Sequence, residues 1–251
     1  MRSTYLDPPR PRVLAHRGLA IEVPENSLAA FERALNAGAG YLETDVRLTR
    51  DGIVVIAHDE TIERMTGRGD SVAALTMAEL RSIDLGSGQT FSTLAEALEA
   101  FPDARFNIDV KVADAVGPVV DVIRSTGASD RVLLTSFSDA RRRRLGELLP
   151  GVATSTGQAG VILVLLASWL RSPSLARRGL RGAAAVQVPE RFRMIRVVSP
   201  GFVDVVHRAG AEVHVWTVNE TEDMRRLLAM GVDGLVSDRP DRVIALLDGQ
   251  N

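Results

Sequence analysis

Hydrophobic and polar residues alternate along this chain with two different periods. Eight short segments are strand-like, most of them continuous runs of Val, Ile, Leu and Ala, and after each segment apolar residues recur every three or four positions. Continuous apolar runs are typical of parallel strands covered on both faces, and the second period is that of an amphipathic helix. The predicted strands span residues 12–16, 41–47, 105–111, 131–136, 151–156, 183–188, 212–218 and 234–238. The predicted helices span residues 26–37, 92–101, 115–126, 138–149, 160–170, 200–209, 220–230 and 240–248.

Eight strand–helix units in succession predict an α/β fold, a single closed (β/α)₈ TIM barrel. The 251 residues are enough for one such barrel, and no shift in composition marks a boundary, so we expect one domain over residues 1–251. Residues that favour helix ends agree with these helices. They are Gly38, Gly127, Gly210 and Gly231 after helices, and Ser138 and Asn219 before them.

The segment YLETDVRLTRDGIVVIAHD departs from the regular alternation. Its two strand-like runs are separated only by Asp51 and Gly52, a link too short for a parallel crossover. The second run is therefore expected to fold back as an antiparallel hairpin. A two-residue turn places Asp45 opposite His58, whereas a change of one residue in the loop places His58 beside Glu43 or between the two acids.

The hairpin is followed by residues 59–91, which show no regular period apart from a short helical piece near 76–82. This stretch lies between the hairpin and the second barrel helix. We therefore expect it to form a small cap insertion over the C-terminal face of the barrel.

Two carboxylates stand two residues apart near the end of the second predicted strand, at Glu43 and Asp45. Alternate residues of a strand share a face, so both side chains should point into the barrel or its upper rim. Two like charges this close repel each other, and a cation between them relieves the repulsion. A solvated strand end, or pairing with an arginine, is the simpler explanation for an isolated pair of this kind.

The first and third predicted strands also carry polar residues at their ends. In RFNIDVKV, Asn107, Asp109 and Lys111 alternate on one face. Asp109 is a candidate third oxygen ligand and Lys111 a candidate partner for an anionic ligand; an internal ion pair between these two side chains is the alternative. On the first strand His16 points inward, and Arg17 begins the following loop.

These positions bring together two imidazoles, three carboxylates, one Arg and one Lys where barrel enzymes hold their active sites. Oxygen ligands in a chain without cysteine favour Mg²⁺ or Ca²⁺ over zinc. Cationic side chains bind phosphate, and histidines titrate near neutral pH. The residues therefore predict metal-assisted cleavage of a phosphoester.

The overall charge argues against one class of partner. With 30 basic and 32 acidic residues, a net charge of −2, the chain lacks the basic footprint of a protein that binds nucleic acid. The N-terminal residues contain no apolar stretch typical of a signal peptide, so a soluble, cytoplasmic protein is expected. The run RRRR, Arg141 to Arg144, spreads around a helix and is interpreted as solvent-exposed.

The most apolar run, VILVLLASWL from Val161 to Leu170, is too short to span a bilayer and predicts a buried helix. The four arginines that follow it belong to the connection into the next strand. This connection is expected at the bottom of the barrel, where docking would turn the catalytic mouth away from a bilayer. Stable membrane attachment is therefore not expected, and the oligomeric state is left open.

The motifs HRG, PENSLAAFERAL, YLETDVRLTRDGIVVIAHDETIERMTG, NIDVK, VHVWTVN and GVDGLVSDRP follow one another between about residues 13 and 240. In this order they resemble the glycerophosphodiester phosphodiesterases. The resemblance implies that His16 and His58 are the catalytic pair. It also implies that Glu43 and Asp45 bind one divalent cation.

Further roles follow from the same resemblance. Arg17 and Lys111 are expected to contact the phosphate of a small phosphodiester substrate, and Trp216 to form a wall of its pocket. The family usually has Glu where this chain has Asp109, and the side chain that is shorter by about 1.5 Å is expected to bind the cation through water or to change the cation preferred. Gln187 is a further inward-facing candidate for substrate contact.

The segment Pro-Glu-Asn-Ser before the first helix has two explanations. Asn26 or Ser27 is expected to cap that helix, and Pro24 to fix its entry. The resemblance adds that Glu25 and Asn26 lie near the catalytic rim, where they brace Arg17 or the waters of the metal.

The implied activity is metal-dependent hydrolysis of glycerophosphodiesters to glycerol 3-phosphate and an alcohol. One histidine attacks phosphorus or deprotonates the nucleophile, and the other protonates the leaving alkoxide, with His58 preferred as the acid. The alternatives are a lysophospholipase D-like or cyclising phosphodiesterase acting on lipid phosphodiesters, and a barrel that binds phosphodiesters without turnover. The alcohol group and the choice between Mg²⁺ and Ca²⁺ stay open.

Overall fold

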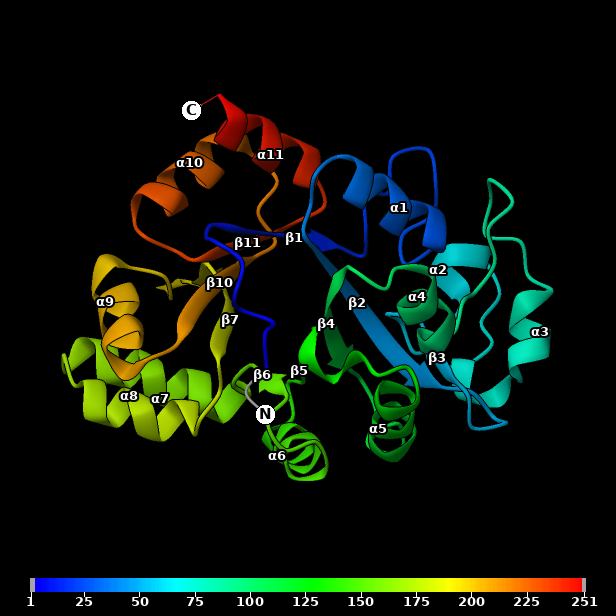
Figure 1. The fold of residues 1–251 in the computed structure, drawn as a ribbon, viewed down its shortest axis with the longest axis horizontal. Helices are drawn as coiled ribbons and strands as arrows, with labels where there is room; N and C mark the ends of the chain where they lie inside the picture. Colours follow the sequence, from blue (N-terminus) through cyan, green and yellow to red (C-terminus); the bar gives the residue numbers. More distant parts are fainter. Residues whose placement is uncertain (1–2, 250–251) are drawn as a thin grey trace.

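Eight parallel strands form a ring in the computed structural model, which describes residues 3–249 (Figure 1). They are β1 (Arg12–His16), β2 (Tyr41–Leu48), β4 (Arg105–Val110), β5 (Val132–Thr135), β6 (Ala153–Thr154), β7 (Ala185–Pro189), β10 (Glu212–Trp216) and β11 (Gly234–Ser237). Their order in the sheet is β6, β5, β4, β2, β1, β11, β10, β7. A bridge between Ser155 and Ala185 joins the two ends of this path. The predicted TIM barrel is confirmed.

Helices cover the outside of the ring, and each predicted helix has a counterpart. They are α1 (Leu28–Asn36), α4 (Leu94–Ala100), α5 (Val116–Ser125), α6 (Asp139–Leu148), α7 (Gln158–Trp169), α9 (Pro200–Ala209), α10 (Thr221–Ala229) and α11 (Pro240–Asp248), with a 3₁₀ helix η2 (Ala128–Asp130) before β5. The layer between helices and strands is apolar and mostly aliphatic. Phe31 of α1 packs edge-to-face on Phe106 of β4, with ring centroids 5.9 Å apart.

The second barrel strand is followed by the predicted antiparallel hairpin. Its returning strand, β3 (Val54–Ile56), pairs with β2. The loop is one residue longer than predicted, because the Thr49 N–H donates to the Ile53 carbonyl at 3.0 Å across three residues. Gly52 has a φ of 78°, the left-handed conformation that a three-residue hairpin loop requires near its end.

This longer loop shifts the register of the hairpin by one residue. The backbone N–H of Ala57 donates to the carbonyl of Asp45 at 3.0 Å, so the expected pairing of Asp45 with His58 is wrong. Continuing the ladder by one step brings His58 level with Thr44, between Glu43 and Asp45. This is the alternative register that a one-residue change in the loop predicted.

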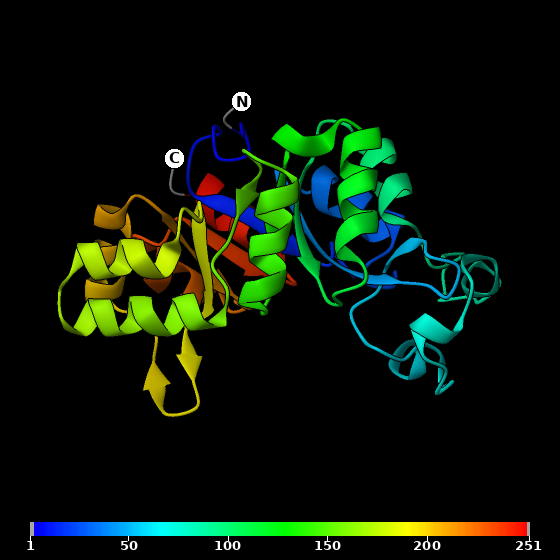
Figure 2. The ribbon, with the colours of Figure 1, turned by 90° about the horizontal axis from the view of Figure 1, so that it is seen from below.

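Residues 59–91 form a cap that has its own small apolar cluster. The cap contains α2 (Glu63–Thr66), the 3₁₀ helix η1 (Val72–Ala74) and α3 (Met77–Arg81), of which only α3 was predicted. Ile62, Val72 and Leu80 are buried together in a cluster separate from the main core. Figure 2 shows the cap projecting on the side of the molecule opposite to both chain termini, which is the side where the barrel strands end.

Two further elements were not predicted. The arginine-rich segment after α7 contains a helix, α8 (Pro173–Leu180), whose first turn is capped by Ser172. A short hairpin of β8 (Arg191–Phe192) and β9 (Ile195–Arg196) follows β7. In Figure 2 this hairpin projects from the same side of the barrel as the cap.

The structure also corrects two interpretations of single motifs. The run RRRR is not simply solvent-exposed, because Arg142 is only 7% exposed and Arg141 donates to the carbonyl of Val110 at 2.6 Å. Asn219 does not cap α10, because its side-chain amide is bonded to Asp238 instead.

Close packing of α7 on α8 generates a stability prediction. A Cβ added at Gly160 would lie 2.0 Å from the Thr156 Oγ1 and 2.6 Å from the Gly179 carbonyl oxygen. Gly160→Ala is therefore expected to lower the free energy of unfolding by about 1–3 kcal/mol, as measured by urea denaturation. Gly146→Ala in α6 is the matched control, since nothing lies within 4 Å of the added Cβ. It should raise the same quantity by about 0.5–1 kcal/mol, and equal effects of the two variants would contradict the contact.

Candidate active site

The first barrel strand ends in His-Arg-Gly, and the structure explains all three residues. His16 is the last residue of β1 and lies level with Glu43 of β2. The Arg17 N–H donates to both the carbonyl (3.0 Å) and the Oε2 (3.1 Å) of Glu43. Gly18 has a φ of 86°, and a Cβ there would lie 2.6 Å from the backbone of Ala30 in α1. Only glycine therefore allows α1 to pack against this loop.

The Pro-Glu-Asn-Ser segment holds the other side of the same loop. Of the two residues predicted to cap α1, Ser27 is the N-cap. Glu25 accepts a hydrogen bond from Arg17 at 2.9 Å, so the expected bracing of Arg17 is present. Asn26 donates to the Oδ2 of Asp45 at 3.3 Å. The segment thus fixes one cation and one carboxylate of the site.

Asp45, Asp109 and Lys111 form an ion-paired cluster between β2 and β4. The strand register places Asp45 level with Asp109. The Nζ of Lys111 lies 2.7 Å from Asp45 Oδ1 and 2.7 Å from Asp109 Oδ2. Arg17 Nε lies 3.2 Å from the other oxygen of Asp45. The internal pair of Asp109 with Lys111 that the sequence left open is therefore present, and it includes Asp45.

The electrostatics of this cluster are dominated by burial. Burial and then the charge of Asp45 raise the pKa of Glu43 to about 8. Burial also raises the pKa of Asp109, although the ammonium of Lys111 opposes it. Burial acts on Asp45 as well, but the charge and hydrogen bond of Lys111 act together with the charge of Arg17, and the pKa of that carboxyl is lowered. Two of the three carboxyls are thus disfavoured as anions, so additional positive charge among them would be bound favourably.

Two buried oxygens on β4, one of them in the cluster, remain available to a ligand. Asp109 Oδ1 and Asn107 Oδ1 have no hydrogen-bond partner among residues 3–249. In the same part of the chain, no three His, Asp or Glu side chains stand at the spacing of a ready-made metal cage. Two of the three carboxylates, Asp45 and Asp109, are instead paired with the ammonium of Lys111, which lies between them.

Each predicted catalytic histidine is oriented by a carboxylate. His16 Nδ1 lies 2.6 Å from Asp238 Oδ1, and its Nε2 lies 3.9 Å from Glu43 Oε2. Burial lowers the pKa of His16, but the hydrogen bond with Asp238 and the charge of Glu43 outweigh it, so that the pKa is raised. His58 Nδ1 lies 2.7 Å from Asp59 Oδ1. In both residues the carboxylate engages Nδ1 and leaves Nε2 as the nitrogen that can act on a substrate.

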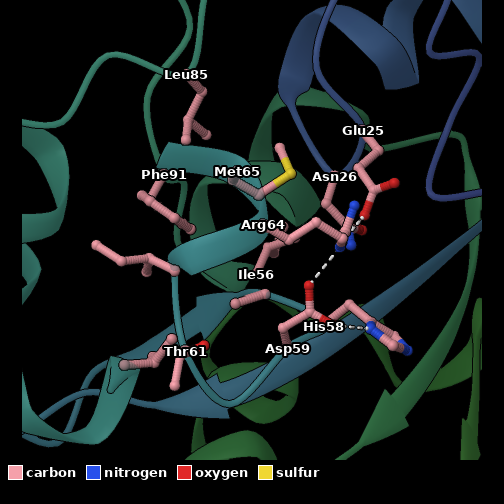
Figure 3. Close-up of a pocket in the computed structure, with 13 residues that line it drawn as sticks. Glu25, Asn26, Ile56, His58, Asp59, Thr61, Arg64, Met65, Leu85 and Phe91 are labelled. Atoms are coloured by element: carbon pink, nitrogen blue, oxygen red, sulfur yellow. Dashed lines mark hydrogen bonds and ion pairs between the residues drawn. The ribbon is translucent and has the colours of Figure 1, made fainter. Parts of the chain in front are cut away.

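Arg64 of α2 links the cap to the catalytic loops. Figure 3 shows its guanidinium between Glu25 and Asp59, at 2.6 Å from each. The cavity beside this bridge measures about 20 Å³, which is room for a single water. The cavity is too small for a phosphodiester, and the bridge joins the cap to the loop between β1 and α1.

An aromatic wall stands on the other side of the barrel mouth. Trp216 ends β10, and its ring packs edge-to-face on Phe137 with centroids 6.1 Å apart. Phe137 is 60% exposed, and Lys111 Nζ lies 5.9 Å from its ring centre. Gln187 lies one layer deeper, level with His214, and its amide nitrogen is 3.3 Å from the ring of that histidine. A substrate contact by Gln187 stays a prediction.

Comparison with known proteins identifies the family. The model of the glycerophosphoryl diester phosphodiesterase family matches residues 16–242. The chain belongs to this family. A relative from Mycobacterium tuberculosis, named "Probable glycerophosphodiester phosphodiesterase 2", is 44% identical over 91% of this chain and 87% of the relative. The glycerophosphodiester phosphodiesterase of Caldanaerobacter subterraneus is 32% identical over 94% and 97%.

Solved structures agree with this assignment to the glycerophosphoryl diester phosphodiesterases. The glycerophosphodiester phosphodiesterase of Agrobacterium tumefaciens superposes with a TM-score of 0.78 at 28% identity, over 95% of this chain and 99% of that one. A phosphodiesterase of Oleispira antarctica, solved with the product sn-glycerol-3-phosphate, gives 0.82 at 26% identity, over 95% and 97%. The expected family is confirmed, and this chain is a phosphoric diester hydrolase.

Sequence reasoning missed four residues in or beside this candidate site. Asp238 orients His16, and Asn219 donates to Asp238 at 2.7 Å. Both follow barrel strands at their C-terminal ends, and this position was the signal that could have found them. Phe137 also follows a strand, β5, whereas Arg64 lies in the cap, where no periodic pattern predicts which way a side chain points.

The contact between Asp238 and His16 generates a titration prediction. Asp238→Asn is expected to lower the pKa of His16, because the imidazolium loses a negatively charged partner while its burial is unchanged. NMR titration of the histidine ring protons measures this shift. Asp204→Asn is the control, since that side chain is 64% exposed and pairs with Arg208 on α9. A His16 pKa that is the same in Asp238→Asn and in the unmodified protein would contradict the assigned contact.

Proposed function

We propose that this protein hydrolyses glycerophosphodiesters to glycerol 3-phosphate and an alcohol, using one divalent cation and two histidines. The observation that carries the proposal is the convergence of an imidazole, three carboxyls and an ammonium at the ends of β1, β2 and β4. The sn-glycerol-3-phosphate in the relative from Oleispira antarctica supports the product.

We assign Glu43, Asp45 and Asp109 as the residues that hold the cation. Their donor atoms are oxygens, which suit Mg²⁺ or Ca²⁺. The unpartnered Oδ1 of Asp109 supports this assignment, and so does the raised pKa of Glu43, which a nearby cation would lower. When bound, the cation supplies charge that stabilises the negative phosphoryl oxygens of the transition state.

Arg17 and Lys111 are assigned to the phosphate of the substrate. Both are held by carboxylates, Arg17 by Glu25 and Lys111 by Asp109, so their cationic groups are fixed before substrate binds. Positioned cations lower the cost of reorganisation when charge develops on the phosphoryl group. Trp216 is assigned to the wall of the pocket.

His16 and His58 are assigned to the proton transfers. His16 attacks phosphorus or removes a proton from the attacking water, and His58 donates a proton to the alkoxide as its bond to phosphorus breaks. In the net reaction water supplies a hydroxyl to phosphorus and a proton to the alcohol. The side chain of His16 is 20% exposed and that of His58 is 34% exposed. The more exposed position of His58 supports its assignment as the acid for the leaving group.

Substitution of each histidine tests these roles. His16→Ala and His58→Ala are each expected to lower kcat for glycerophosphocholine by roughly 10²–10⁴-fold. With a nitrophenyl ester of glycerol phosphate, whose alkoxide needs no proton, His58→Ala should recover most of its activity and His16→Ala should not. His207→Gln, outside the site, is the control. Recovery of His16→Ala alone would reverse the two roles, and full activity in both variants would refute them.

Metal removal tests the cation. Dialysis against a chelator is expected to abolish turnover, and added Mg²⁺ or Ca²⁺ should restore it. Glu43→Gln should raise the metal concentration needed for half-maximal activity, because an oxygen ligand loses its charge. Glu220→Gln, a substitution at a side chain that is 76% exposed, is the matched control. Undiminished turnover after chelation would show that no exchangeable cation takes part.

A second candidate is a lysophospholipase D-like or cyclising phosphodiesterase acting on lipid phosphodiesters. The exposed ring of Phe137 beside Trp216 favours it, since an apolar rim suits an acyl chain. Phosphorus NMR of the products separates the two candidates. A persistent cyclic phosphate would assign attack to a substrate hydroxyl, whereas glycerol 3-phosphate alone supports hydrolysis by water.

A further inference from the structure

Exposed apolar side chains are concentrated in one part of the described chain. Of ten large hydrophobic residues that are exposed, eight lie in α7 or at its C-cap Leu170, in the β8–β9 hairpin or at Phe137. A contiguous exposed apolar surface in a soluble protein usually marks an interaction site.

The first part of this surface is one face of α7. Its members recur at helical spacing and are all exposed by 42% or more: Ile162, Leu166, Trp169 and Leu170. The opposite face packs inward through Gly160 and Val164, both of which contact Gly179 of α8. In Figure 2, α7 lies nearer than α8 to the side from which the β8–β9 hairpin projects. The exposed face of α7 therefore lies on the side of this helix that is away from α8.

The second part is the β8–β9 hairpin itself. Phe192 is 57% exposed, Met194 94% and Ile195 46%, and arginines alternate with them in the sequence RFRMIR. The nearest acid, Glu190, is paired with Arg226 and Arg196. The tip of the hairpin thus presents apolar side chains between cationic ones.

Charge is as unevenly distributed as the apolar residues. Residues 148–203, which include α7, α8 and the hairpin, contain seven arginines, no lysine and a single acid, Glu190, whereas the whole chain has a net charge of −2. Three of these arginines, Arg191, Arg193 and Arg196, lie in the β8–β9 hairpin itself, and a local excess of positive charge of this kind indicates an anionic partner.

We infer that the exposed face of α7 and the β8–β9 hairpin form a docking surface for an anionic lipid bilayer. Arginines attract acidic headgroups, while Phe192, Met194 and Trp169 enter the interface between headgroups and acyl chains. A nucleic acid would use the arginines but not the apolar side chains. A second copy of this chain would bring arginines against arginines at a symmetric interface.

Docking through this surface turns the catalytic mouth toward the bilayer. The hairpin follows β7 and projects on the same side as the cap, where the barrel strands end (Figure 2). The sequence argument against attachment concerned a basic connection at the bottom of the barrel, and it does not apply to this hairpin. Within residues 3–249 no helix is long and apolar enough to cross a membrane, so the docking is peripheral.

Vesicle sedimentation tests the surface without any assay of activity. The full chain is mixed with vesicles of phosphatidylcholine alone, or with one quarter phosphatidylglycerol, and is expected to bind only the anionic ones. Arg191→Gln with Arg193→Gln should weaken binding roughly 30-fold, about fivefold for each arginine near the surface. Met194→Ser should weaken it roughly 10-fold through the loss of buried apolar area.

Matched controls remove equal groups outside the surface. Arg143→Gln with Arg144→Gln on α6 removes two exposed arginines, and Ile53→Ser removes an apolar side chain that is 40% exposed. Both should bind like the unmodified protein, and all variants should keep its melting temperature. Equal binding to neutral vesicles, or equal losses in the controls, would overturn the proposal. So would a dimer that forms through Met194 without vesicles, or tighter binding to duplex DNA that survives Met194→Ser.

Discussion

Lys111 makes the interaction on which the site depends. It places an ammonium between two carboxylates that are both almost fully buried, and these carboxylates come from neighbouring strands of the barrel. Removing one partner of a buried ion pair leaves an uncompensated charge, which is strongly destabilising. The same charges therefore hold β2 and β4 in register at their ends and keep the anionic oxygens directed into the mouth.

The barrel could be predicted from the sequence because its signal is local and repeated. Most strands are apolar runs and most of the following helices have one apolar stripe, so the eight units were recognisable without any knowledge of tertiary contacts. Several residues of the candidate site could be predicted from the sequence for the same reason. Glu43 and Asp45 share a strand face and Asp109 lies on the next strand, where topology alone brings the three together.

The parts that were missed depend on contacts between distant segments. The hairpin register followed from one extra residue in its loop, which the dipeptide Asp-Gly does not reveal. Helix α8 has only two leucines and one alanine among its eight residues and carries two adjacent arginines, so its sequence resembles a connection until Gly179 is seen to pack against α7. No local pattern marks Asp238 as a partner of His16. Their contact becomes evident only when β11, the last strand, is seen to pair with β1.

The contact between Asp238 and His16 has a consequence for when the candidate site can form during synthesis. β11 pairs with β1, and Asp238 directly after β11 holds the imidazole of His16. During synthesis the N-terminal histidine leaves the ribosome some two hundred residues before its partner does. A nascent or truncated chain that lacks β11 and Asp238 therefore has an unoriented His16 and an open ring, and the two ends of the site meet only after residue 238 has been synthesised.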